Sequence, residues 1–325
     1  MTTALELVAQ VPFGIDAAAL DRLAPVREAF PSRSATRRAQ TPAGYWFARF
    51  GVAHRNEWPA AAWRLSEDAD DGLWLCADPV GFAIEGADVV VNAHAGADLS
   101  TDEAATFVGM LNRHFEPEGL RFVSLRPSRW LMRLPAEPAV RTTPASLAHR
   151  HALMTVAPEG ADATRLTRIA TEAQMLFHDC APNQTRLARG QLALGGVWLW
   201  GAGRRGDSPP VSADLTLCSD EPHLRGLAGA AGATVHERAV DASVLACGPG
   251  TTVVDLCDTP LEGEEWLAWF ERDWLAPLAH GASGTKVGLT LLFPDLAVSA
   301  PLFQRAWRLP FGGRGLAAWL GSPSP

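Results

Sequence analysis

The chain has 325 residues, a typical length for two domains, and its 47% content of hydrophobic residues is that of an ordinary globular protein. Its formal net charge of −8 argues against a nucleic-acid binder, because such proteins usually present a strongly basic surface. Its longest apolar runs, such as residues 289–293, are far shorter than the roughly 20 residues of a membrane span. We therefore expect neither nucleic acid nor a membrane among its partners.

Cysteine usage and the N-terminus indicate the compartment. The chain has five cysteines, an odd number, and no two of them form a C-x-x-C pair. This pattern predicts buried thiols in a reducing compartment rather than a disulfide framework or a zinc site. The first ten residues, MTTALELVAQ, lack the basic and apolar segments of a signal peptide, so we expect a cytoplasmic protein.

The N-terminal part predicts a strand, a helix and a loop. Residues 5–11 favour a strand, and a helix follows from a cap at Asp16 until Pro25 interrupts it. Residues 31–45 are basic and rich in Pro, Ser and Thr, so we expect a loop there.

The middle of the chain carries the two most regular helix patterns. Ser100 and Glu103 form a capping box at the start of the first helix. The second helix starts at Asp162 and carries an apolar stripe at i, i+3, i+4 and i+7 spacing. Strands are expected on both sides of the first helix, at residues 73–77, 88–92, 120–124 and 129–134.

Strands and helices alternate in the C-terminal part. This alternation predicts an α/β fold with a mostly parallel sheet that helices cover on both faces. The expected strands are 197–200, 213–218, 251–257 and 287–293, with extended residues near 297–307; the expected helices are 222–230 and 261–278, with a short turn at 316–320.

The stretch from His178 to residue 205 is the most specific candidate for a ligand site. It holds a histidine, an asparagine, several arginines and a G-x-G after a strand, and arginine forks with exposed backbone N–H groups suit a phosphate or carboxylate. A surface helix end with a tight glycine turn explains the same spacing, and a lone G-x-G favours that simpler interpretation. The candidate phosphate ligands are His178, Asn183, Arg186, Gly201, Gly203 and Arg204.

Acidic residues after two strands form the second candidate. Asp255 and Asp258 end one strand and Asp295 follows another, and open parallel sheets bind ligands at the carboxyl ends of their strands. These acids could hold a divalent ion, but helix caps and turn acids are the more frequent roles. A relocated metal site would need a histidine such as His223 or His236.

Other motifs are weaker. His149 and His151 flank Arg150, and lone histidines are more often structural than ligands. The aromatic run at residues 266–274 predicts the core face of a helix, with a protein contact as the alternative. The sequence contains no G-x-S-x-G, H-E-x-x-H or P-loop motif.

Several stretches resemble one family. They are LCADPVGFAI, DLSTDEAATFVGMLNRHF with EGLRFVSLRPSRWLMRL, and MLFHDCAPNQTRLARG with VWLWGAG. They are similar to the archaeal-type cofactor-independent phosphoglycerate mutases, and most of all to their bacterial offshoot, the RpfE-type regulatory proteins. The resemblance implies an alkaline-phosphatase-like α/β core, formed by residues 1–72 and 196–325, with an inserted smaller α+β domain over residues 73–195.

The positions that the resemblance assigns to catalysis are largely replaced. In the true mutases of this family two metal ions and a serine nucleophile transfer a phosphoryl group. The first strand here ends in residues 11–14, VPFG, in place of an Asp-Gly dipeptide, and residues 39–43 contain no serine. Asp258 and Asp295 remain, but the histidines beside them are lost. The residues that do match are His178, Asn183, Arg186, Gly190, Gly201 and Gly203.

These replacements favour a non-catalytic regulatory or binding protein on a degenerate mutase scaffold. Two isolated carboxylates cannot hold two close ions, and a missing nucleophile removes the covalent intermediate. We therefore assign no catalytic residue and no cofactor, and expect a phosphorylated metabolite or a protein as the partner. One alternative is a metal-dependent phosphomutase or phosphatase with relocated ligands, which would use Mn or Zn. A second alternative is a protein-interaction adaptor.

Overall fold

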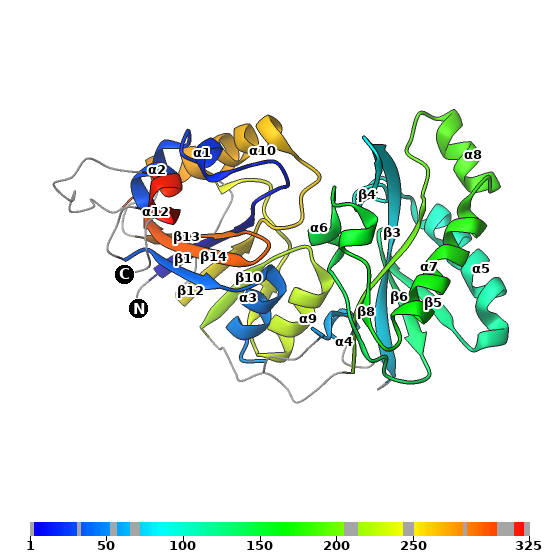
Figure 1. The fold of residues 1–325 in the computed structure, drawn as a ribbon. Coiled ribbons are helices and arrows are strands. Elements are labelled where there is room, and N and C mark those ends of the chain that lie inside the picture. Colours follow the sequence, from blue (N-terminus) through cyan, green and yellow to red (C-terminus); the bar gives the residue numbers. More distant parts are fainter. Residues whose placement is uncertain are drawn as a thin grey trace. The chain divides into compact units, whose positions relative to one another are not determined.

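The structure is a computed structural model that describes residues 3–30, 34–52, 57–65, 72–204, 214–242, 250–281, 285–303 and 315–321. The contacts within the chain divide it into two compact units. The first unit is Met1–Val52 with Ser208–Pro325, and the second is Ala53–Asp207. Each unit has a sheet of its own (Figure 1).

The first unit contains a seven-stranded sheet in the order β11-β10-β12-β1-β13-β14-β2. Neighbouring strands from β11 to β13 run parallel, whereas β14 is antiparallel to both β13 and β2. Val8 of β1 lies beside Asp255 of β12 and Thr290 of β13, so the carboxyl ends of these strands meet at one edge. The bounds are β1 Thr3–Gln10, β2 Thr36–Ala39, β10 Leu215–Cys218, β11 Thr234–His236, β12 Gly250–Asp255, β13 Lys286–Leu292 and β14 Leu296–Leu302.

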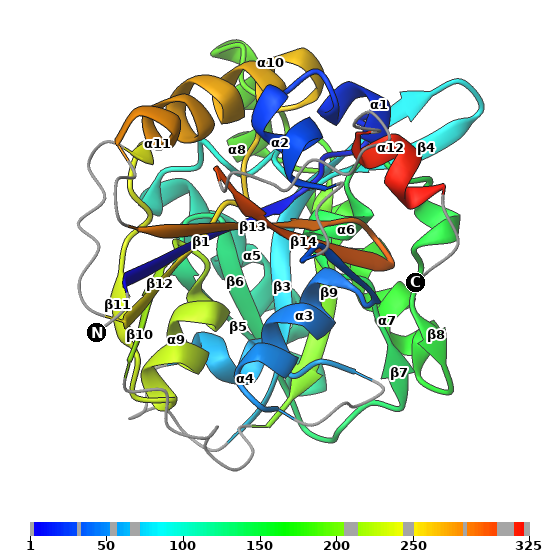
Figure 2. The same cartoon turned by 90° about the vertical axis from the view of Figure 1, so that its left-hand side faces the viewer.

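Helices cover both faces of this sheet. Figure 2 shows α1, α2, α10, α11 and α12 on one face and α3 with α9 on the other. The first group encloses an apolar core that includes Leu7, Val26 and Leu316. The bounds are α1 Ala17–Leu20, α2 Ala24–Ala29, α3 Pro42–Arg49, α9 Pro222–Ala230, α10 Gly263–Trp269, α11 Ala276–Gly281 and α12 Leu316–Leu320.

The prediction of a loop over residues 31–45 is wrong where these residues are described, because they contain β2 and the start of α3. Thr41 caps α3 by accepting a hydrogen bond from the Gly44 N–H (3.1 Å), and Pro42 lies in the first turn, where no helical bond needs its N–H. β2 pairs with β14 as an edge strand. The Pro- and Thr-rich composition that indicated a loop is here a helix start signal.

The aromatic run at residues 266–274 forms the core face of a helix, as predicted. Trp266, Phe270 and Trp274 are fully buried in the core of the first unit. The backbone is π-helical over the segment η4, Phe270–Leu275, between α10 and α11. Trp269 of the same run is only partly buried against this core, so the adaptor alternative stays a prediction.

The second unit has an antiparallel sheet in the order β4-β3-β6-β5, and β9 also pairs with β3. The helices α5 and α7 bury their apolar stripes against it, and α8 lies on the same side (Figure 1). The strands are β3 Leu73–Glu85, β4 Asp88–Asn92, β5 Arg121–Arg126, β6 Arg129–Leu134 and β9 Gly196–Gly203, with a separate pair β7 Val140–Arg141 and β8 Glu159–Gly160. The helices are α4 Ala60–Arg64, α5 Thr101–Phe115, α6 Ala145–Ala148, α7 Ala163–Phe177 and α8 Ala181–Ala188, with 3₁₀ turns η1 Glu116–Glu118 and η2 Leu153–Thr155.

The predicted α/β class is confirmed, with a mostly parallel sheet flanked by helices and a second, antiparallel sheet. The capping box of α5 is also confirmed: Glu103 N–H donates to Ser100 Oγ (3.2 Å), and Ser100 N–H donates to Glu103 Oε2 (2.9 Å). Within the described residues, no helix has both the length and the apolar character needed to cross a membrane.

We predict that Ser100→Ala lowers the free energy of unfolding by about 1 kcal/mol, because the Glu103 N–H loses its acceptor at the start of α5. Urea denaturation followed by circular dichroism measures the change. Thr106→Ala is the matched control, since the Thr106 hydroxyl bonds only the Asp102 carbonyl within the same helix. An equal loss in both variants would contradict the capping role.

Candidate functional site

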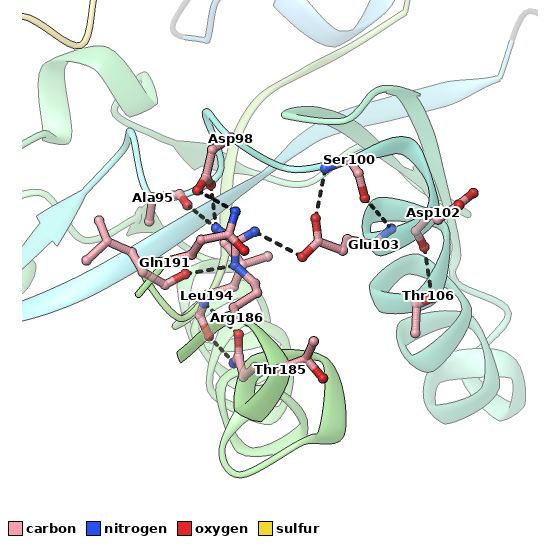
Figure 3. A network of polar contacts seen from close by, with 12 residues as sticks. Ala95, Asp98, Ser100, Asp102, Glu103, Thr106, Thr185, Arg186, Gln191 and Leu194 are labelled. Carbon is pink, nitrogen blue, oxygen red and sulfur yellow. Dashed lines mark hydrogen bonds and ion pairs between the residues drawn. The ribbon is translucent and has the colours of Figure 1, made fainter. Parts of the chain in front are cut away.

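Arg186 has its guanidinium inside the second unit. The side chain is 0% exposed, and Figure 3 shows acceptors around it from separate parts of the chain. Its Nε donates to the Leu192 carbonyl (2.8 Å). Its terminal nitrogens donate to the Ala95 carbonyl (3.3 Å), to the Asp98 carboxylate and to the Glu103 carboxylate (3.3 Å). Arg186 therefore ties α8 to the start of α5 and to the segment before it.

The two carboxylates beside Arg186 are held in their charged form. Partial burial acts to raise the pKa of Asp98, but the hydrogen bond and charge of Arg186 hold it below its ordinary value. The Ser100 N–H and then Arg186 lower the pKa of Glu103. Gln191 adds a second donor to Asp98 (2.9 Å). A buried guanidinium requires such paired acceptors, because an isolated buried charge is strongly unfavourable.

Asn183 and Gly190 also serve the fold. The Asn183 amide nitrogen donates to the carbonyls of Phe177 and Leu194 (both 2.8 Å), and its oxygen accepts from the Leu194 N–H (2.8 Å). Gly190 has φ +74°, a left-handed conformation that favours glycine, and its N–H donates to the Leu187 carbonyl at the end of α8. These contacts account for both residue types without an external ligand.

Gly201 does bind an anion, and the anion is the carboxylate of Glu57. The Gly201 N–H donates to Glu57 Oε1 (2.7 Å), and the Thr142 N–H donates to Glu57 Oε2 (2.8 Å). The Thr142 hydroxyl donates to Glu57 Oε1 as well. Burial raises the pKa of Glu57, although these donors oppose the shift. We call the donors Thr142 N–H, Thr142 Oγ1–H and Gly201 N–H the carboxylate nest.

His178 and Arg204, two further candidate phosphate ligands, lie near opposite ends of β9. A Cβ placed on Gly196, where β9 starts, would lie 3.6 Å from Gln174 Cα near the end of α7, and His178 follows directly after this helix. Arg204 comes eight residues after Gly196, which is roughly 25 Å along a strand. His178 is 80% exposed and lies 3.4 Å from the Asp179 carboxylate. The structure thus does not bring His178 and Arg204 together.

Gly203 is required by packing. A Cβ at this position would lie 2.3 Å from the Cβ of Pro59, in the segment that leads into α4. No real side chain tolerates that distance from a proline ring. The second glycine of the G-x-G motif therefore lets the α4 segment approach β9 closely.

The sequence reasoning missed a buried ion pair between α4 and β3. Arg64 donates to both carboxylate oxygens of Asp78 (2.6 and 3.0 Å), and its guanidinium lies 5.0 Å from the centre of the Trp200 ring. The Trp200 indole N–H donates to the same carboxylate (2.8 Å). An arginine in a short alanine-rich stretch and an aspartate in an apolar strand gave no spacing signal, so only the structure pairs them.

The carboxyl edge of the seven-stranded sheet carries Asp255. It is 2% exposed, its Oδ2 accepts from the Ser219 hydroxyl (2.7 Å), and its Oδ1 accepts from the Cys257 N–H (3.0 Å). The Ser219 hydroxyl in turn accepts from the Glu221 N–H (3.0 Å). Burial raises the pKa values of both Asp255 and the Cys257 thiol. These groups form a closed hydrogen-bonded unit.

The backbone carbonyls of Asp258 and Asp295 each accept a hydrogen bond. The Asp258 carbonyl accepts from Arg238 (2.8 Å), and the Asp295 carbonyl accepts from the Gln40 N–H (2.9 Å). Their strands, β12 and β13, lie on either side of β1. His223, a histidine that a relocated metal would need, has its Nδ1 2.8 Å from Glu221 Oε1.

The donor groups do not fit the two metal ions that the family resemblance implies. Across the described ranges there is no group of three or more His, Cys, Asp or Glu residues that could hold a metal ion. Asp255, the buried acid at this edge, directs both carboxylate oxygens to donors of the chain.

Comparison with solved structures finds similar chains. The chain is similar to the PH0037 protein from Pyrococcus horikoshii, with 12% identity, a TM-score of 0.52, and coverage of 99% of this chain and 93% of that chain. It is also similar to the cofactor-independent phosphoglycerate mutase from Thermoplasma acidophilum, with 13% identity, a TM-score of 0.44, and coverage of 99% and 96%. No protein-family model and no curated protein matches the chain. At this identity the likeness to the PH0037 protein extends to the fold alone, and nothing here supports the RpfE-type name.

We predict that Arg186→Ala lowers the free energy of unfolding by about 3–5 kcal/mol, because two carboxylates and two carbonyls lose their shared donor. Chemical denaturation at neutral pH measures the loss. Arg189→Ala is the matched control, since Arg189 is an exposed arginine at the end of the same helix. A loss no larger than in the control would show that the Arg186 network is not structural.

Proposed function

We propose that this chain is a non-catalytic binding or regulatory protein on an α/β scaffold similar to that of cofactor-independent phosphoglycerate mutases. One observation carries the proposal: groups suited to hold a phosphate are engaged by carboxylates of the chain itself. Arg186 is held by Asp98 and Glu103, and the Gly201 N–H is held by Glu57. Residues of this type in an active phosphoryl-transfer site would instead face the substrate.

The carboxyl edge of the first sheet supports the same proposal. Ser219 is 0% exposed, and its hydroxyl donates a hydrogen bond to the carboxylate of the buried Asp255. A hydroxyl without access to solvent cannot attack an external phosphoryl group, because a nucleophile must reach the reacting atom. Ser219 therefore serves as a partner of Asp255 rather than as a nucleophile.

A phosphorylated metabolite stays the proposed ligand class for the exposed side chains of His178 and Arg204. Because the two lie at opposite ends of β9, one phosphate would contact one of them and not both. Calorimetry with 3-phosphoglycerate tests this part: heat that Arg204→Ala or His178→Ala abolishes would support it. An absence of heat at millimolar concentration would leave a protein as the partner.

We predict no conversion of 3-phosphoglycerate above the buffer blank, with or without added Mn²⁺ or Zn²⁺. A coupled assay for the 2-phospho isomer measures the rate, and an active mutase serves as the positive control. Metal-dependent conversion that Asp295→Asn or Asp258→Asn abolishes would overturn the proposal in favour of a relocated catalytic site.

A further inference from the structure

The carboxylate nest is assembled from two separate parts of the second unit. Thr142 follows β7 directly, while Gly201 lies within β9. The Gly201 N–H also lies 3.1 Å from the Thr142 hydroxyl oxygen, so the donors adjoin one another. Three donors that converge on two oxygens make a recognition surface for a planar carboxylate.

Gly201 has a backbone conformation that turns its N–H away from the strand pairing. Its φ is +68°, and the register of β3 with β9 shifts between Trp74 and Cys76, opposite this part of β9. A Cβ on Gly201 would lie 2.9 Å from the Cβ of Ala60. Only glycine fits this bulge, and the bulge presents the amide to an anion.

Burial disfavours the charged form of the Glu57 side chain in the nest. Desolvation is the largest influence on its pKa and raises it, although hydrogen bonds from Thr142, Gly201 and Ala202 act to lower it. Release of the Glu57 side chain to water would therefore recover hydration, whereas the nest donors would be left without their acceptor. An incoming carboxylate that replaced Glu57 would restore those bonds and would lose hydration in the same way, so the exchange depends on its concentration relative to the effective concentration of the tethered Glu57.

We propose that the carboxylate nest is a binding site for a small organic carboxylate and that Glu57 is its internal occupant, which the ligand displaces. The inference rests on the proposed function only in that the chain binds a ligand rather than transforms one. It assigns to Glu57 an autoinhibitory contact: the site opens when a competing carboxylate takes the place of the side chain. The nest residues are positioning and binding groups, and the exchange breaks no covalent bond.

The decisive experiment titrates acetate into the wild-type chain and follows the amide signals of Thr142 and Gly201 by NMR. Because Glu57 is tethered, its effective concentration is in the millimolar range or above, so acetate is used up to hundreds of millimolar, against chloride at equal ionic strength. We expect saturable shifts at these two amides. A purely structural Glu57 predicts no acetate-specific shift, and that result would overturn the proposal.

Glu57→Ala gives an independent measurement, because the substitution removes a group of the size of acetate. We expect a lower Tm than wild type, and a recovery of about 2–4 °C at acetate concentrations a few times its Kd. Glu159→Ala is the matched control: it removes an exposed carboxylate on the neighbouring β8 that pairs with Arg141 and lies outside the nest. The double variant Glu57→Ala/Thr142→Val should lose the acetate response.

The remaining outcomes are also decisive. If Glu57→Ala does not fold alone, acetate during refolding should restore folded protein, and an absence of any restoration would refute the site. Inorganic phosphate is the second probe, and a response to phosphate equal to that of acetate would refute selection for a carboxylate. Turnover of 3-phosphoglycerate would overturn the proposed function without changing these amide shifts, so the two ideas fail separately.

Discussion

The burial of the Arg186 guanidinium is the interaction on which the second unit depends. A fully buried cation must be surrounded by acceptors, and here they come from the segment after β4, from the first turn of α5 and from the segment after α8. Glu103 connects this requirement to helix formation, because the same carboxylate closes the capping box. The position of α8 against α5 is therefore fixed by charge pairing as well as by apolar packing.

The same constraint recurs at two other places in this unit. Asp78 on β3 is neutralised by Arg64, and Glu57 is held by the carboxylate nest. Glu57 and Arg64 both belong to the short segment at residues 57–64. This segment packs along β9, where Gly201 and Gly203 leave room for it. Internal ion pairs and hydrogen bonds thus take up polar groups that an enzyme of similar fold could direct to a substrate.

Local sequence signals predicted those elements whose stability is local. The capping box at Ser100 and the apolar stripes of α5 and α7 identified these helices. Both signals depend on residues only three or four positions apart, so they can be read directly from the sequence. The prediction of a loop over residues 31–45 is wrong for a related reason. A threonine followed by proline starts a helix as readily as it forms a loop. The π-helical turn at Phe270–Leu275 had no signature, since its buried aromatic residues suit an α-helix equally well.

The sequence marked Arg186 and Gly201 as candidate phosphate ligands, but residue spacing could not identify the carboxylates that contact them in the fold. Arg186 is 88 residues from Asp98 in sequence, and Gly201 is 144 residues from Glu57. A cluster of arginine and glycine predicts that an anion will be bound, because the donors must be satisfied. It does not predict whether the anion is a ligand or a side chain, since both satisfy the donors equally. The answer depends on which carboxylates the tertiary fold brings within reach.

This ambiguity has a physical consequence for any chain that carries such donors. A buried arginine or a bulged glycine cannot simply be left without its anion, because the unsatisfied group would destabilise the fold. Such a chain must either keep a ligand or supply a carboxylate of its own. Asp98 and Glu103 pair with Arg186 inside the fold, whereas burial leaves Glu57 poorly solvated in its nest. We infer that Glu57 is the internal anion whose place an external carboxylate takes, because its donors are backbone N–H groups and a hydroxyl that a free carboxylate can also bind.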